Sequence, residues 1–407
     1  MATSRKEGWF AAIGVALGVL FAAGLGLYAF LNSMATPLHP NPQDVQSVTQ
    51  GTPSPEWAGA VEQARQLARA SLVEHNLPGL SVAVGAGGDI VWAEGFGWAD
   101  LENRVPVTPN TRFRIGHASK ALTSAGVGLL LENDRLHLGD EIQTYVPAFH
   151  RKEWPVTLRQ LMGHMAGVRH YRNEVDYMPS SHCERASEGV QSFADDPLLF
   201  EPETQYKYST FGWILVSAAV EAAAGEPFFT FMRTKIFTPL GMAATTPDSA
   251  TESIPDRATF YYPRLSGDPT YGPELAPAVD YSCFAGAGGF LSTPADLVRF
   301  GVALSTGKLL QRATVRKLQT PQVLASGKET EYGLGWMLET VTLAGEPTEV
   351  AGHASRTPVG GSTSFMSFPE RGLVVAVVSN ISFAETRSIA LNIAETFAAR
   401  EKGPARK

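Results

Sequence analysis

Cysteine is scarce in this chain of 407 residues, which contains only Cys183 and Cys283. Two cysteines cannot build the dense disulfide framework of a small secreted domain, and without a Cys-x-x-Cys pair the sequence gives no indication of zinc or thiol redox chemistry. One disulfide is compatible with an exported chain, and two buried free thiols fit the sequence equally well. The cysteines alone therefore leave the compartment open.

The chain also lacks an excess of positive charge. Its formal net charge is −7, with acidic and basic residues interspersed, which argues against a nucleic-acid partner. No His-Glu-x-x-His motif is present, and His164 and His170 are spaced so that one helix face would not hold both. We therefore predict no metal and no cofactor, and expect these two histidines to bond to the backbone in turns.

A long apolar segment is present at the N-terminus. Residues 9–31 form an uncharged run of 23 residues, enough to span a bilayer as a helix. Arg5 and Lys6 precede the run and no Lys or Arg follows before Arg65, so the positive-inside rule predicts that residues 1–8 are cytoplasmic. We predict a single-pass anchor in the inner (cytoplasmic) membrane, with the domain on the periplasmic or extracytoplasmic side. A signal peptide cleaved after residue 35 is the alternative.

The remaining patterns predict one α+β domain. Residues 32–55 are proline-rich and indicate a tether, residues 56–400 indicate the domain, and residues 401–407 a short tail. An early hairpin, helices in the middle, and strands followed by a helix at the end predict one antiparallel sheet completed by both chain ends, flanked by helices, with an all-helical insertion. The expected helices are 56–76, 117–132, 210–224 and 385–400, and the expected strands are 80–84, 90–98, 363–368 and 373–379.

The most informative stretch is residues 111–132, where an extended segment passes through Gly116 into a long apolar helix. Its first turn carries His117, Ser119 and Lys120. The N–H groups at a helix start have no intrahelical partners and the dipole there is positive, so this turn can hold a developing oxyanion. His117 lies three residues before Lys120 and shares its helix face, whereas Ser119 points about 100° away from Lys120.

Two later stretches add chemistry. The sequence Tyr206-Lys207-Tyr208-Ser209-Thr210 precedes a helix, and Gly352-His353-Ala354-Ser355-Arg356 precedes the last strands. Together with the first stretch, they resemble the Ser-x-x-Lys, Tyr-x-Asn and Lys-Thr-Gly or His-x-Gly elements of serine β-lactamases, penicillin-binding proteins and their esterase and peptidase relatives. Class C β-lactamases and D-alanyl-D-alanine carboxypeptidases belong to this group. Gly167-Val168-Arg169-His170-Tyr171 resembles the LACTB-like subgroup most closely.

The resemblance implies a β-lactamase/transpeptidase-like fold and a set of site residues. His117 occupies the place of the nucleophilic serine, with Ser119 as the other candidate nucleophile. Lys120 and Tyr208 are implied to move the proton, and a nearby Lys120 would favour the phenolate of Tyr208. The resemblance also assigns the His-x-Gly position to His353, substrate contacts to Thr210, Ser355 and Arg356, and the oxyanion donors to the N–H groups of residues 117 and 356. Ser355 stands where glycine is usual and is expected to narrow the cleft.

Three functions are compatible with this pattern. The first is a membrane-anchored hydrolase that acts by acyl transfer on an amide or ester, such as a cell-wall peptide, a β-lactam or a small ester. The second is a non-catalytic module that binds peptidoglycan peptide or a protein ligand. The third is a scaffold that forms filaments. The predicted partners are a small-molecule or peptide substrate and the membrane through residues 9–31, and an oligomer is compatible with the resemblance.

Overall fold

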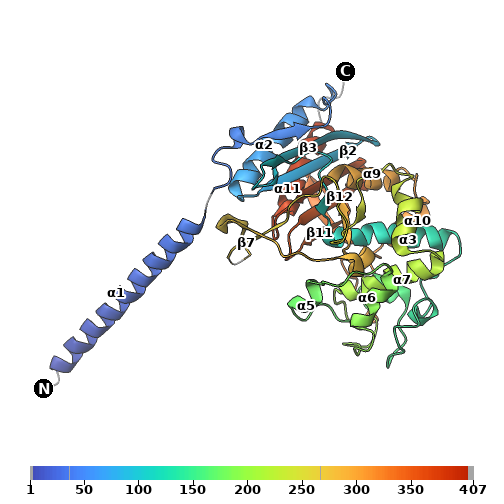
Figure 1. Ribbon diagram of the computed structural model, residues 1–407, viewed down its shortest axis with the longest axis horizontal. Helices are drawn as coiled ribbons and strands as arrows, with labels where there is room; N and C mark the ends of the chain where they lie inside the picture. Colours follow the sequence, from blue (N-terminus) through green and yellow to red (C-terminus); the bar gives the residue numbers. More distant parts are fainter. Residues whose placement is uncertain (1–2, 36, 266, 402–407) are drawn as a thin grey trace.

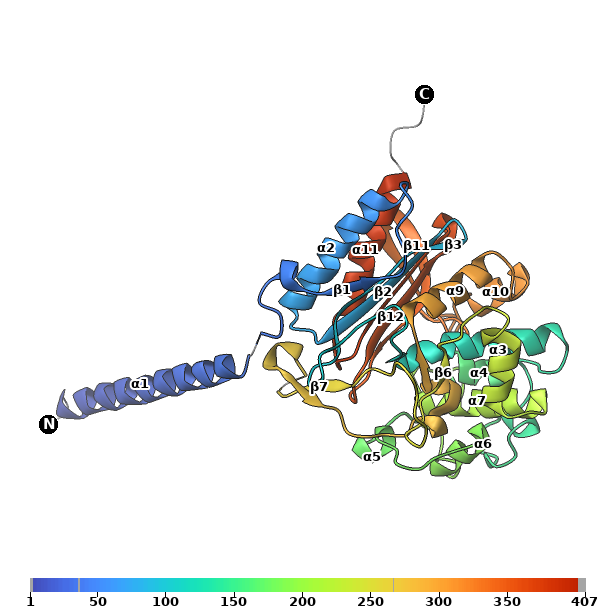
Figure 2. The ribbon, with the colours of Figure 1, turned by 45° about the horizontal axis from the view of Figure 1, so that its top comes forward.

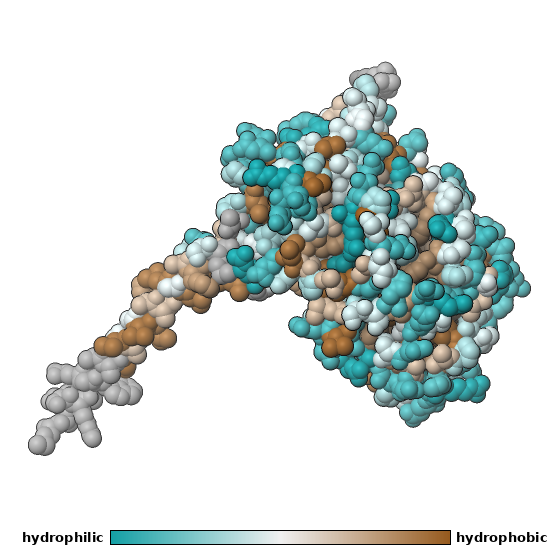
Figure 3. All heavy atoms as spheres, in the orientation of Figure 1, coloured by the Kyte–Doolittle hydropathy of each residue, from teal (hydrophilic) through white to brown (hydrophobic). Residues whose placement is uncertain are grey.

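The computed structural model describes residues 3–35, 37–265 and 267–401, so the predicted tail from residue 402 onward lies outside the described residues. Helix α1 (Thr3–Met34) projects from the rest of the molecule (Figure 1). Its segment Ile13–Ser33 is long and apolar enough to cross a membrane, and none of it is covered by other parts of the chain. Figure 3 shows the apolar surface along this helix.

One antiparallel sheet forms the centre of the fold, with the strand order β1-β3-β2-β13-β12-β11-β10. Its strands are β1 (Ser47–Thr49), β2 (Gly79–Ala86), β3 (Asp89–Asp100), β10 (Met337–Leu343), β11 (Glu346–Arg356), β12 (Ser362–Phe368) and β13 (Leu373–Ser379), and β4 (Val105–Pro106) pairs with β3. The pairing of β13 with β2 joins the two ends of the chain. The predicted α+β sheet completed by both chain ends is therefore confirmed.

Helices cover both faces of this sheet. Alternate side chains of β13 enter different apolar clusters: Val375 and Val377 pack with α2 (Ala58–Glu74) and α11 (Thr386–Glu401), whereas Val374 and Ala376 pack with α9 (Pro294–Ser305). This alternation follows from the two-residue period of a strand, and it explains why all residues of β13 are buried. Figure 2 shows α2 and α11 together on one side of the strands.

The middle of the chain forms the predicted helical insertion. Helix α3 runs through its centre, and its side chains are buried on nearly all sides. The helices of this part are α3 (Ser119–Glu132), α4 (Leu158–Met162), α5 (Glu174–Tyr177), α6 (Ala186–Gly189), α7 (Thr210–Ala224) and α8 (Phe228–Met232). Outside it lie α10 (Arg312–Leu318) and the short strands β5 (Phe113–Arg114), β6 (Thr246–Pro247), β7 (Tyr261–Pro263), β8 (Pro273–Leu275) and β9 (Phe290–Ser292).

Three local features bear on the sequence predictions: the tether, the start of the helix near His117, and the state of the two cysteines. Part of the predicted tether is integrated into the domain, because β1 pairs with β3 and Val45 is buried. The turn that carries His117 is a 3₁₀ turn, Gly116–Ala118, and the α-helix begins only at Ser119. The two cysteines form a disulfide across a sequence separation of 100 residues, so the alternative of free thiols is wrong.

Candidate active-site cleft

His117 lies at the turn between β5 and α3. Gly116 has φ +49°, a conformation that glycine adopts without strain, and the chain turns there to place residue 117 beside β11. The His117 side chain is partly exposed, and its N–H donates a hydrogen bond to Ser355 Oγ at 3.0 Å. Residue 117 is therefore only partly covered by other residues, and its backbone contacts the sheet.

Lys120 lies one turn further along and is completely buried. Its Nζ donates to the carbonyl oxygen of Ala287 at 2.7 Å and lies 5.1 Å from the centre of the Tyr208 ring. Burial lowers the pKa of Lys120 well below its usual value, since the charged form loses its hydration. Burial therefore shifts Lys120 toward the neutral amine, the form that can accept a proton.

Tyr208 lies against both of these residues, with its ring centre 5.4 Å from that of His117. Its hydroxyl oxygen is buried and has no hydrogen-bond partner among the residues that the structure describes. Burial raises the pKa of Tyr208 well above 10, and neighbouring tyrosines, Tyr332 first, raise it further. The predicted phenolate is therefore wrong, because desolvation outweighs the attraction of a lysine that is itself held toward the neutral form.

The start of α7 positions Thr210. Ser209 caps this helix, with its hydroxyl accepting from the N–H of Gly212 at 3.0 Å. Thr210 Oγ1 lies 3.3 Å from His117 Nε2. His164 Nδ1 accepts from the N–H of Ser209 and His170 Nδ1 from that of Thr210, at 3.1 and 3.2 Å. The two histidines bond to the backbone as predicted, and in doing so they fix the segment that carries Tyr208 and Thr210.

His353 enters the site from β11, with its ring centre 6.3 Å from that of His117. Its Nδ1 lies 3.0 Å from the carbonyl oxygen of Ala354 and its Nε2 lies 3.1 Å from Tyr332 Oη. A carbonyl can only accept, so Nδ1 carries the proton and Nε2 accepts from the tyrosine. Burial, and then Lys120, lower the pKa of His353 to about 3. Sequence reasoning missed Tyr332, which lies in no recognisable motif.

Two predicted residues are placed differently. Ser119 is fully buried, and no hydrogen-bond partner for its hydroxyl occurs in the part of the chain that the structure describes. The Arg356 side chain bonds to the carbonyl of Phe383 and to Glu385, each at 2.8 Å. Because side chains alternate along a strand, Arg356 and Ser355 point to opposite faces of β11. The Arg356 side chain is therefore not brought to His117.

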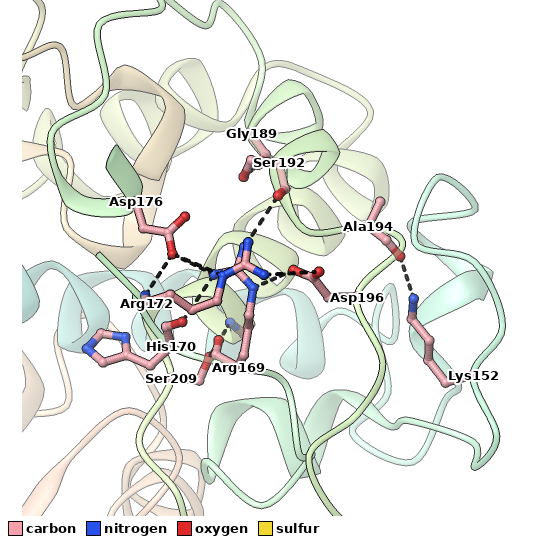
Figure 4. A network of polar contacts seen from close by, with 11 residues as sticks. Lys152, Arg169, His170, Arg172, Asp176, Gly189, Ser192, Ala194, Asp196 and Ser209 are labelled. Atoms are coloured by element: carbon pink, nitrogen blue, oxygen red, sulfur yellow. Dashed lines mark hydrogen bonds and ion pairs between the residues drawn. The ribbon is translucent and has the colours of Figure 1, made fainter. Parts of the chain in front are cut away.

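An ion-pair cluster around Arg169 lies next to Ser209 at the start of α7 (Figure 4). Arg169 is 6% exposed, and its guanidinium pairs with Asp176 at 2.9 Å and with Asp196. The carbonyl of Arg169 accepts from Ser209 Oγ at 2.7 Å. This cluster connects the irregular segment 170–196 to the cap of α7, so that segment and the one with Tyr208 are held together.

The fold and the arrangement of His117, Lys120, Tyr208 and His353 define a protein of the β-lactamase and penicillin-binding-protein class. Comparison with known proteins agrees, since the family model described as Beta-lactamase matches residues 61–399. The chain belongs to this family.

Curated relatives and solved structures extend this assignment. The chain is 29% identical to the human "Serine beta-lactamase-like protein LACTB, mitochondrial", over 88% of this chain and 84% of that protein. It is 26% identical to "Penicillin-binding protein 4*" of Bacillus subtilis, over 74% and 67%. The D-amino acid amidase of Ochrobactrum anthropi superposes with a TM-score of 0.69 at 23% identity, covering 85% of this chain and 99% of that one. The octameric penicillin-binding protein homologue of Pyrococcus abyssi also gives 0.69, at 23% identity and with 84% and 78% covered.

Proposed function

We propose that this chain is a membrane-anchored protein whose cleft binds an amide- or ester-bearing ligand, with recognition in place of serine acylation as its main activity. The ligand class that we propose carries a D-amino acid in amide or ester linkage, and a peptide ending in a D-amino acid is the form tested below. This class is suggested by relatives named "Teichoic acid D-alanine hydrolase" and "D-aminopeptidase" and by the similar amidase.

The observation that carries the proposal is the unpartnered hydroxyl of Tyr208. A buried polar atom without a partner costs about 1–3 kcal/mol, and a ligand that supplies a hydrogen-bonding group removes this cost. Lys120 adds a second cost, because a lysine with no carboxylate partner among the described residues loses hydration on burial. Two such costs beside a partly exposed His117 are expected in a site that binds a ligand, and a purely structural role does not account for them.

His117 argues against ordinary serine chemistry. The imidazole nitrogens lie farther from the backbone than a serine hydroxyl would, so a carbonyl attacked by them is displaced from the backbone N–H groups of the helix start. A displacement of about 1 Å can lower a rate about 100-fold. Ser119 does not replace the missing serine, because no hydrogen bond connects its hydroxyl to Lys120 or Tyr208 among the described residues.

A second candidate function is slow acyl transfer through His117 itself. The pKa of His117 is lowered well below its usual value by burial, then by Lys120 and His353, so the ring is held neutral. A neutral imidazole is nucleophilic, and an acyl-imidazole is hydrolysed readily. In this alternative the ring nitrogen attacks the carbonyl carbon, the leaving group departs with a proton, and water then releases the acid.

We further propose that the domain lies outside the cytoplasm. The apolar span Ile13–Ser33 and the positive charges before it favour a single-pass anchor. The disulfide between Cys183 and Cys283 supports an oxidising compartment. The human relative is described as mitochondrial, so the comparisons do not favour the bacterial inner membrane that the sequence analysis predicted. An oligomer or filament stays a prediction.

The test uses the full chain in non-ionic detergent with two fluorescent probes, a penicillin and a peptide ending in D-alanyl-D-alanine. Anisotropy measures equilibrium binding, and intact mass measures covalent adducts. We expect saturable binding without a mass shift, weakened by Tyr208→Phe and Lys120→Met but not by the exposed control Lys308→Met. A mass shift that disappears in His117→Ala would favour acyl transfer. Absence of both binding and adduct would contradict both functions.

A further inference from the structure

The N–H of residue 117, in the 3₁₀ turn that precedes α3, already has a partner. Ser355 Oγ accepts its hydrogen bond at 3.0 Å, and Ser355 is only 3% exposed. The Ser355 hydroxyl also lies close to Gly116. A Cβ atom added to Gly116 would lie 2.3 Å from Ser355 Oγ. The serine hydroxyl therefore fills the space next to this turn, where a ligand oxygen would otherwise approach the N–H.

The strand that carries Ser355 holds the hydroxyl in place. Strand β12 pairs with β11 on one side, with Ser355 opposite Thr363. On the other side β10 pairs with β11 only as far as Gly352, so residues 353–356 extend beyond β10 and lie beside the turn of residue 117. Directly after the strand, Thr357 Oγ1 donates to the carbonyl groups of Gly360 and Gly361 at 2.6 and 2.8 Å. Ser355 is thus held by the pairing with β12 on one side and by the hydrogen-bonded turn of Thr357 that follows it.

We propose that Ser355 closes the oxyanion position of the cleft and determines which ligands it accepts. With the hydroxyl in place, the carbonyl oxygen of an amide or ester cannot bind the N–H of residue 117. Ligands are then held by the rest of the cleft, without polarisation of their carbonyl. This inference rests on the proposed function. It gives a second reason, independent of His117, why the site would bind a ligand without acyl transfer.

The experiment introduces the residue types usual in the family, serine at position 117 and then glycine at position 355, again in the full chain in detergent. Acylation by penicillin is followed by intact mass over time in His117→Ser, in His117→Ser with Ser355→Gly, and in His117→Ser with Ser364→Gly. Ser364 is a matched control, because it is a buried serine on the neighbouring strand whose hydroxyl contacts Thr386. Loss of one oxyanion donor lowers catalysis about 10²- to 10³-fold, so we expect Ser355→Gly to accelerate acylation at least about 100-fold.

A second measurement does not depend on catalysis. Ser355→Ala keeps a residue suited to the strand and removes only the hydroxyl, so hydrogen exchange at the amide of residue 117 should accelerate, whereas Ser364→Ala should leave it unchanged. Equal acylation rates with and without Ser355→Gly, or unchanged exchange at residue 117, would overturn the inference. Failure of the proposed function would appear in a different measurement, the binding of the fluorescent probes to the wild-type chain, and so is distinguished from failure of this inference.

Discussion

Replacing Lys120 with methionine should remove a pH dependence from the stability of the protein. Lys120 is 0% exposed, its recorded hydrogen bond is to the carbonyl of Ala287, and no carboxylate pairs with it among the described residues. Methionine has a similar length and no charge. The substitution therefore tests whether this cleft carries a buried amine that resists protonation.

The sign and size of the effect follow from linkage. Burial lowers the pKa of Lys120 in the folded state, whereas the unfolded chain keeps a value near about 10.4. Between these two values the unfolded state binds one more proton, so the free energy of unfolding rises with pH. A difference of one bound proton between the two states corresponds to a slope of about 1 kcal/mol per pH unit, which is the upper limit for this one group. Lys120→Met loses this slope, so its stability relative to wild type is greatest at the lower pH.

Urea denaturation at several pH values from about 7.5 to about 9.5 measures the difference between wild type and Lys120→Met. In this range ordinary histidines are already neutral and tyrosines are still protonated, so the difference reports on the lysine. The exposed Lys308→Met provides the control and should run parallel to wild type. Parallel curves for Lys120→Met and wild type would refute the buried neutral amine, and with it the proton acceptor of the site.

Other changes test the surroundings of the cleft. Arg169→Met leaves two aspartates without their buried partner and should destabilise the domain by about 3–5 kcal/mol in urea denaturation, against under about 1 kcal/mol for the exposed Arg172→Met. Ser209→Ala removes the cap of α7 and should cost about 1 kcal/mol, and an unchanged denaturation midpoint would disprove the capping role. Burial, and then Lys120, lower the pKa of His170 to about 4. In an NMR titration its ring resonances should therefore show little protonation from about pH 7 down to about pH 5, whereas a midpoint near about 6.5 would contradict the burial of this ring.

The sheet was predictable from the sequence because its signals are local. Strands such as β2 and β13 are apolar runs bounded by turn residues, and their positions at the two chain ends indicated that they belong to one sheet. Strand β1 was missed, since three residues among prolines and polar residues carry no clear period. Helix α7 was predicted with its observed bounds, because it begins after a capping serine and ends at Gly225.

His117, Lys120, Tyr208 and His353 were predicted to lie together and do so, whereas Tyr332 and the electrostatics of the site were not predictable. Spacing placed His117 and Lys120 on one helix face, and the order of the motifs indicated that Tyr208 and His353 would join them. The direction of the Tyr208 pKa depends on burial by residues distant in sequence, which spacing does not report. The bond between His117 and Ser355 likewise joins residues separated by 238 positions, and only the folded chain reveals it.

The pairing of β2 with β13 has a consequence for how the protein is made. The hairpin of β2 and β3 is synthesised early, but its neighbour β13 ends at residue 379, close to the end of the described chain. Until that strand emerges, β2 presents an unpaired and strongly apolar edge, a feature that promotes aggregation. Contacts of such large sequence separation also form slowly. The nascent chain must therefore protect this edge for most of its synthesis, and a truncation that removes the last strands would leave it permanently exposed.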